Sequence, residues 1–195
     1  MKRAFDFLVA LFGLAALSPL LAVVALLIKA TSRGPVFFRQ ERVGRGFRRF
    51  EIFKFRTMVR DAPSLGGQLT VGEDLRITRI GRLLRKTKLD ELPQLINVLK
   101  GEMSFVGPRP EVPRYVEMFR KDFEEVLTVR PGITDLASLK YRHESDILGK
   151  SNDADSAYAS EILPDKISLA KEYLRRSSLW FDLTLILKTL LRLAV

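Results

Sequence analysis

The feature that most constrains the fold is a run of 22 uncharged residues near the amino terminus, 7-FLVALFGLAALSPLLAVVALLI-28. A helix of that length would reach ~33 Å, enough to cross the ~30 Å hydrocarbon layer of a membrane. A cleaved signal peptide is one alternative, but no A-x-A-like site is evident and the apolar run is longer than a typical signal core. On length alone, the run predicts a helix that spans the membrane.

Two details favour a re-entrant segment instead. Pro19 falls near the middle of the run, where it removes a helical hydrogen bond and predicts a kink, and Ser18 beside it can supply a partner for a freed backbone group. Positive residues mark the cytoplasmic side of a membrane segment, and they flank both ends of this one: Lys2, Arg3, Lys29 and Arg33. We therefore predict a helix–break–helix over 1–32 that enters one leaflet and returns.

The composition limits the chemistry that the chain can perform. Lys and Arg number 33 against 23 Asp and Glu, and the net charge of +10 favours an anionic partner such as a lipid surface, a phosphorylated substrate or nucleic acid. The chain has no cysteine, and His143 is its only histidine. Disulfides, thiolate nucleophiles, multi-histidine metal sites and a conventional Ser-His-Asp triad are thereby excluded. Carboxylates, Lys, Ser, Thr or Tyr must do any catalytic work.

The remaining pattern predicts a mostly helical α+β domain over 33–195 on the cytoplasmic face. Residues 35–58 predict a β-hairpin, because two aromatic and β-branched runs flank a Gly-Arg-Gly turn. The hairpin is strongly basic, and Lys54 and Arg56 on its second strand are candidates to face a diphosphate. The following stretch, 61–73, predicts a loop.

Apolar spacing also predicts several helices. Residues 75–86 predict a helix with a basic stripe, and 112–127 a helix with one core face. The polar stretch 142–161 predicts a surface excursion. The tail, 179–195, is apolar on nearly every side and predicts an amphipathic carboxy-terminal helix that is either buried or lies in a membrane interface.

The stretch 88-KLDELPQLINVLKGEMSFVGPRP-110 carries the strongest chemical signal. Its apolar residues recur at helical spacing over 91–100, and Pro93 is tolerated only in a first turn, which places the helix start at about Asp90. Asp90 and Glu91 then lie at a helix amino terminus, where the dipole favours the ionised carboxylate. A capping role alone is common at such a position and is the simplest interpretation.

The neighbourhood of the acid pair suggests more than capping. A basic stripe leads into the motif, and Arg109 lies between two prolines in 107-GPRP-110, where Gly107 permits an unusual turn. A rigid arginine suits bidentate binding of phosphate. These residues fit a phosphoryl-transfer site in which one carboxylate attacks phosphorus and the other helps to hold Mg²⁺. Direct attack by an acceptor phosphate would use similar residues, so both routes stay open.

The central motif, with 54-KFRTM-58 upstream and 130-RPGIT-134 downstream, closely resembles the bacterial sugar transferase family. These are the monotopic phosphoglycosyl transferases that begin polysaccharide and glycoconjugate assembly, and the resemblance covers essentially the whole chain. It implies a membrane-anchored enzyme at the cytoplasmic face of the inner membrane. Such an enzyme would move a sugar-1-phosphate from a UDP-sugar to a polyprenol phosphate, typically undecaprenyl phosphate, and release UMP.

The resemblance also implies roles for particular residues. Asp90 would be the nucleophile that forms a covalent phosphosugar intermediate, and Glu91 would act in catalysis with Mg²⁺. Both acids would be ligands of that ion, and Arg85 and Arg109 would bind phosphate. The hydrophobic segment would be a re-entrant element broken at Ser18 and Pro19. The chain would correspond to the catalytic core of the family, in contact with anionic membrane lipids and not with nucleic acid. A homo-oligomer is left open.

The chain departs from the family pattern in two places. Many relatives continue Pro-Gly-Ile-Thr with Gly-Trp-Ala-Gln and an Asn-Gly-Arg, whereas this chain has 135-DLASLKYR-142. Many carry an acidic residue shortly before the late tyrosine, and aligning Tyr173 places Ala170 there. Both changes fall where sugar or nucleotide contacts are expected, so the donor sugar stays undetermined.

A non-enzymatic alternative is a membrane-anchored basic scaffold that binds anionic lipid or nucleic acid. It accounts for the net charge and the hydrophobic segment, but gives no reason for the acid pair or the Gly-Pro-Arg-Pro loop.

Overall fold

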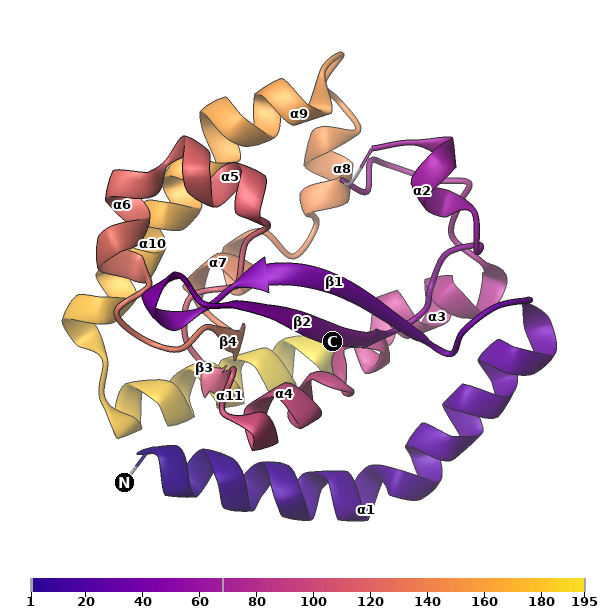
Figure 1. Ribbon diagram of the computed structural model, residues 1–195, viewed down its shortest axis with the longest axis horizontal. Helices are drawn as coiled ribbons and strands as arrows, with labels where there is room; N and C mark the ends of the chain where they lie inside the picture. The colour runs from indigo at the N-terminus through magenta and orange to yellow at the C-terminus, as the bar shows by residue number, and fades with distance from the viewer. Residues whose placement is uncertain (1, 68, 195) are drawn as a thin grey trace.

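The computed structural model describes residues 2–67 and 69–194, which form a mostly helical α+β arrangement with two small sheets (Figure 1). A β-hairpin runs across the middle of the molecule, with helices on both sides of it. The mostly helical α+β class predicted from the sequence is confirmed.

The apolar run forms α1, Lys2–Thr31, which is one continuous helix that bends along its length (Figure 1). Pro19 has no N–H to donate to the carbonyl of Ala15, and the hydroxyl of Ser18 donates to that carbonyl over 2.8 Å. The predicted role of Ser18 is confirmed, and the predicted break is a bend inside one helix. In the part of the chain that the structure describes, α1 is the one helix long and apolar enough to cross a membrane.

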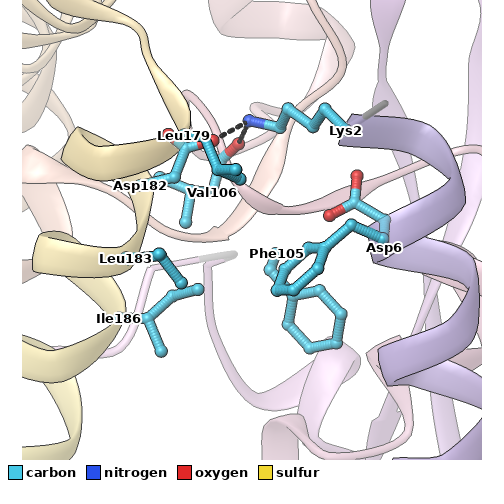
Figure 2. A pocket seen from close by; sticks show the side chains of 9 residues that line it. Lys2, Asp6, Phe105, Val106, Leu179, Asp182, Leu183 and Ile186 are labelled. Atoms are coloured by element: carbon cyan, nitrogen blue, oxygen red, sulfur yellow. Dashed lines mark hydrogen bonds and ion pairs between the residues drawn. The ribbon is translucent and has the colours of Figure 1, made fainter.

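The basic pair at the amino end of α1 binds the rest of the molecule. Lys2 Nζ donates to the carboxylate of Asp182 over 2.5 Å and to the carbonyl of Val106 over 2.9 Å (Figure 2). Arg3 donates over 2.5 and 2.8 Å to two carbonyls at the end of α4, Gln94–Lys100. These contacts fix the start of α1 to the domain that carries the acid pair.

The predicted hairpin is confirmed. β1, Phe37–Val43, pairs antiparallel with β2, Arg49–Phe55, through a 3₁₀ turn, η1, Arg45–Phe47. Gly46 within that turn has a φ of 64°, which glycine adopts at little cost.

A second sheet holds the loop of Arg109 in place. β3, Ser104–Val106, pairs parallel with β4, Gly132–Thr134. A Cβ on Gly107 would lie 2.4 Å from the carbonyl oxygen of Arg130, so the close approach of two backbones requires glycine there. The unusual turn predicted at Gly107 is wrong, since its φ is not positive.

Two predicted helices have different bounds. α3, Arg79–Thr87, begins after Thr78, whose hydroxyl accepts from the N–H of Gly81, and Arg76 pairs with Asp74 outside the helix. The single helix predicted over 112–127 is two helices that meet at Phe119: α5, Pro113–Met118, and α6, Arg120–Val126. The core face predicted for this stretch is confirmed, because its apolar residues lie in one buried cluster.

The other helices are short except for the last two. The predicted loop over 61–73 contains α2, Ala62–Leu65. The stretch 142–161 is less of a surface excursion than predicted, because it forms helical turns and buries Leu148 and Tyr158. The remaining elements are α7, Leu136–Lys140; α8, Glu144–Leu148; α9, Ala154–Ala157; a π-helical turn, η3, Tyr158–Ile162; and α10, Leu163–Arg176.

The predicted carboxy-terminal helix is α11, Leu179–Ala194. Leu185 and Asp182 on one face are buried against the domain. The opposite face leaves several large apolar side chains exposed: Leu179, Trp180, Leu187, Leu190 and Leu191. The helix is therefore partly buried and partly exposed.

Candidate active site

Asp90 and Glu91 lie in a single 3₁₀ turn, η2, Leu89–Glu91, between α3 and α4. α4 itself begins at Gln94, with Pro93 in the capping position, so the start predicted at about Asp90 is wrong by one turn. Within the described residues no side chain caps α4. Capping therefore does not explain why two acids stand here.

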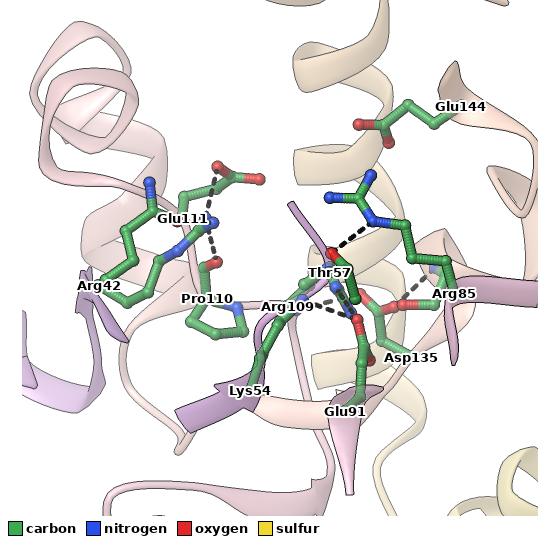
Figure 3. Close-up of polar contacts among 12 residues, drawn as sticks. Arg42, Lys54, Thr57, Arg85, Glu91, Arg109, Pro110, Glu111, Asp135 and Glu144 are labelled. Carbon is green, nitrogen blue, oxygen red and sulfur yellow. Dashed lines mark hydrogen bonds and ion pairs between the residues drawn. The ribbon is translucent and has the colours of Figure 1, made fainter. Parts of the chain in front are cut away.

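Glu91 is the centre of a buried ion triad (Figure 3). Its Oε1 accepts from Lys54 Nζ over 2.8 Å and from Arg109 Nη2 over 2.6 Å, and its Oε2 accepts from Arg109 Nη1 over 3.4 Å. Its side chain is 11% exposed. Burial by itself would raise the pKa of Glu91, but the charges of Arg109 and Lys54 outweigh burial and hold that pKa well below its usual range.

Asp90 is perturbed in the opposite direction. It is buried, and its Oδ1 has no hydrogen-bond partner in residues 2–67 and 69–194. Burial, with the negative charge of Glu91, raises the pKa of Asp90 despite the opposing charge of Lys54. The expectation that the helix terminus would favour ionisation of both acids is therefore wrong for Asp90.

Arg109 is held at both its side chain and its backbone. Its guanidinium binds Glu91, and its backbone N–H donates to Asp135 Oδ2 over 3.1 Å. The other oxygen of Asp135 accepts from the N–H of Ser138 over 2.7 Å and so caps α7. Asp135 belongs to the stretch that departs from the family pattern, and no local signal in the sequence predicted its contact with Arg109.

The structure places the other predicted basic residues in two different environments. Arg85 lies on α3 facing the site, and its guanidinium donates to Thr57 Oγ1 over 2.8 Å (Figure 3). It also donates to Thr70 Oγ1 over 3.0 Å. Arg56 is not brought to the acid pair. It donates to Ser32 and to the carbonyl of Arg33, and so holds the chain just after α1.

A second polar group, which the sequence did not indicate, lies beside the Arg109 loop. Arg42 on β1 donates to the carbonyl of Pro110 over 3.1 Å, and the hydroxyl of Tyr158 donates to Glu111 Oε1 over 2.6 Å. Figure 3 shows Arg42 and Glu111 across the site from Arg85. These residues come from distant elements, so only the folded chain reveals that they meet.

The two acids could hold a magnesium ion. Mg²⁺ takes oxygen ligands and is usually bound by one or two carboxylates plus substrate phosphates. Among the residues described, the one hydrogen bond to Glu91 Oε2 is the 3.4 Å contact from Arg109 Nη1. Among residues 2–67 and 69–194 no three or more His, Asp or Glu side chains gather as ligands. The residues thus fit an ion shared with substrate phosphates, and not a cage made by protein alone.

Comparison with known proteins places the whole chain, residues 1–195, within a family model described as bacterial sugar transferase. The chain is 40% identical over 192 residues to the UDP-N-acetylgalactosamine-undecaprenyl-phosphate N-acetylgalactosaminephosphotransferase of Aeromonas hydrophila, covering 97% of this chain and 42% of that protein. It is 41% identical over 198 residues to the undecaprenyl-phosphate glucose phosphotransferase of Komagataeibacter xylinus, covering 98% of this chain and 35% of that protein.

A third relative is covered more fully. The chain is 38% identical over 193 residues to the UDP-glucose:undecaprenyl-phosphate glucose-1-phosphate transferase of Caulobacter vibrioides, covering 96% of this chain and 67% of that protein. The chain spans less than half the length of the Aeromonas and Komagataeibacter relatives.

Proposed function

The chain belongs to the bacterial sugar transferase family, and from that premise we propose that it transfers a sugar-1-phosphate from a UDP-sugar to a polyprenol phosphate and releases UMP. The names of the relatives support this substrate class, since the Aeromonas protein is named for UDP-N-acetylgalactosamine and undecaprenyl phosphate. The observation that carries the proposal is the buried Asp90 carboxylate, with an unbonded oxygen in the described chain, beside a triad that holds two cations.

The proposed reaction has two steps. An oxygen of the Asp90 carboxylate attacks the phosphorus that bears the sugar, the bond from that phosphorus to the UMP oxygen breaks, and UMP leaves with the electron pair. The enzyme then carries an acyl phosphate ester of the sugar. An oxygen of polyprenol phosphate attacks the same phosphorus, the acyl phosphate bond breaks, and the Asp90 carboxylate is restored.

The basic side chains around the acid pair stabilise the negative charge of the phosphoryl group during its transfer. Lys54 places a positive charge near the attacking carboxylate of Asp90, and Arg85 acts on the same carboxylate from α3. Arg109 holds a further positive charge on the neighbouring Glu91. Fixed cations of this kind stabilise charge on a phosphoryl group in transfer without reorganising. Asp90 must be ionised to attack, so its raised pKa makes the reaction depend on pH.

Glu91 is the residue that we assign to magnesium, through Oε2, together with the diphosphate of the donor. A bound Mg²⁺ would neutralise diphosphate charge as UMP leaves. Asp90 as a second ligand to the ion stays a prediction from the sequence.

The fixed ends of α1 support a re-entrant placement at the cytoplasmic face of the inner membrane. Lys2 binds Asp182 at one end, and Arg56 binds the chain at Ser32 after the other end. Both ends of α1 therefore contact one domain, and the bend at Pro19 lets the helix between them enter one leaflet. The exposed apolar face of α11 would lie in the same interface, where basic residues can contact anionic headgroups.

The proposed function is tested by assaying UMP release with a panel of UDP-sugars and undecaprenyl phosphate in detergent or lipid nanoparticles. The wild type should release UMP with at least one donor, and Asp90→Asn should abolish the release. An Asp90→Asn variant that kept most of the activity would show that another residue attacks. Salt-dependent nucleic-acid binding without UMP release would favour a scaffold.

A further inference from the structure

Helix α4 carries two buried amide side chains whose hydrogen bonding differs completely. Asn97 is fully satisfied: its Nδ2 donates to the carbonyl of Glu51 and to Glu102, each over 2.7 Å, and its Oδ1 accepts from the N–H of Phe53 over 3.0 Å. Gln94 is 1% exposed, and within the described chain neither its Oε1 nor its Nε2 has a partner.

An unbonded buried amide is costly for folding. It has lost its hydrogen bonds to water and gained none from protein, and native structures contain few such groups. An apolar side chain of similar volume would suit the same position better. The amide of Gln94 is therefore expected to have a use other than stabilising the fold.

A complementary atom lies one turn earlier. Asp90 Oδ1 is also buried without a partner among the residues described. The chain between the two residues stays right-handed, with φ and ψ of −55° and −36° at Leu92 and of −60° and −15° at Pro93. Side chains three and four apart on such a segment are neighbours, and they slope toward the amino end. We therefore expect the Gln94 amide to extend toward the turn that carries Asp90 and Glu91.

Of the two acids in that turn, Asp90 is the one that can take the amide's hydrogen bond. Glu91 Oε1 already accepts from Lys54 and Arg109, and Glu91 Oε2 accepts from Arg109 over 3.4 Å and is the oxygen assigned above to magnesium. Among the residues described, Asp90 Oδ1 is an acceptor and Gln94 Nε2 a donor that no hydrogen bond uses.

We propose that Gln94 is a positioning residue for Asp90. In the reacting enzyme its Nε2–H donates to Asp90 Oδ1, which fixes the carboxylate and leaves Oδ2 to attack phosphorus. In the acyl phosphate Oδ1 is the carbonyl oxygen, and the same hydrogen bond draws charge onto it as the carboxylate leaves in the second step. Gln94 itself gains and loses no proton. This inference rests on the proposed function, because it assigns Asp90 as the nucleophile.

The test replaces each buried amide with an apolar side chain of similar size. In Gln94→Met we expect an unchanged or higher Tm, since two unbonded polar atoms are removed. Its kcat should fall about 100-fold, as for a misplacement of about 1 Å at the reacting atoms, with KM for the UDP-sugar little changed. The acid limb of its pH–rate profile should move to higher pH, because the ionised carboxylate has lost a donor. Gln94→Leu should repeat the pattern.

Asn97→Leu is the matched control. It removes an amide from the same helix whose bonds are all made, so its Tm should fall by at least about 4 °C. The acid limb of the pH–rate profile of Asn97→Leu should lie at the same pH as in the wild type.

Each other result decides against the inference. Gln94→Met with wild-type kcat and an unmoved acid limb would show that the amide does not act on Asp90. A Tm loss as large as that of Asn97→Leu would show a structural amide, bonded through water. Asp90→Asn is assayed in parallel. A wild type that releases no UMP, or an Asp90→Asn variant that still does, would overturn the proposed function and not this inference alone.

Discussion

Replacing Arg109 with methionine should destabilise the protein far more than removing a surface arginine. The change leaves Glu91, whose side chain is 11% exposed, with Lys54 as its one remaining ion-pair partner among the residues that the structure describes. Breaking a buried ion pair costs about 3–5 kcal/mol. Arg109 is 30% exposed and one cation remains, so we expect about 2 kcal/mol. For a chain of this length that corresponds to a fall in Tm of about 4–8 °C.

The assay is thermal unfolding in detergent, with a double-mutant cycle. Arg109→Met leaves the Glu91 carboxylate without the cation of Arg109, and adding Glu91→Gln removes that carboxylate charge. The loss of unfolding free energy in the double variant should therefore be about 1–2 kcal/mol smaller than the sum of the losses in the two single variants. Arg114→Met is the matched control, because its pair with Asp155 is 62% and 46% exposed and should contribute under ~1 kcal/mol. Strictly additive losses, or equal losses in Arg109→Met and Arg114→Met, would refute this reasoning.

The same triad gives the effect of pH a definite sign. Its cations hold the pKa of Glu91 below the unfolded value of ~4.3. The stability that they contribute is therefore fully present above pH ~4.3 and is lost as the pH falls through the lower, folded pKa. The Tm gap between wild type and Arg109→Met should narrow over that acidic range.

The pKa of Asp90, two further contacts and the placement of α1 can each be tested separately. Burial raises the pKa of Asp90, so UMP release should decline as the pH falls through a value above the ~3.9 of a free aspartate; a limb at or below ~3.9 would argue against Asp90 as the titrating group. Asp135→Ala frees the backbone of Arg109 and uncaps α7, so kcat should fall about 10-fold or more with a modest loss of Tm; unchanged kinetics would show that the loop holds itself. Lys2→Met leaves the buried Asp182 without its cation and should cost about 1–2 kcal/mol by thermal unfolding, which Asp182→Asn in the same chain should partly restore; no restoration would mean that Lys2 acts through its other contacts. Tags at the two ends of the chain should both be reachable only from the cytoplasm, and an amino-terminal tag found outside would mean that α1 spans the membrane.

The parts of the fold that the sequence predicted correctly depend on neighbours in the chain. The hairpin was predictable because its turn and its alternating strands are contiguous. The hydrogen bond of Ser18 was predictable because its acceptor lies three residues away. The break at Phe119 was not predictable, because the apolar spacing continues through Phe119 although its backbone leaves the helical conformation, with φ of −118° and ψ of 36°. The burial of Tyr158 was missed because its partner, Glu111, lies 47 residues earlier.

The same distinction between local and distant neighbours holds for the candidate site. Asp90 and Glu91 were identified because adjacent acids in a distinctive motif are visible in one short stretch. What each acid does depends on distant groups, since Lys54 comes from the hairpin and Arg109 from the loop after β3. A helix-dipole argument could not foresee that burial would raise the pKa of one acid while two cations lowered that of its neighbour.

Covalent attachment of the sugar phosphate to Asp90 is the central claim. The most direct measurement is the intact mass of the enzyme after incubation with a UDP-sugar that it uses and with no polyprenol phosphate present. We expect a mass increase equal to one sugar phosphate ester. The increase should disappear when undecaprenyl phosphate is added, and it should be absent in Asp90→Asn. An enzyme that turns over with both substrates but shows no adduct with the donor alone would mean that Asp90 carries no sugar phosphate and that the lipid phosphate attacks directly.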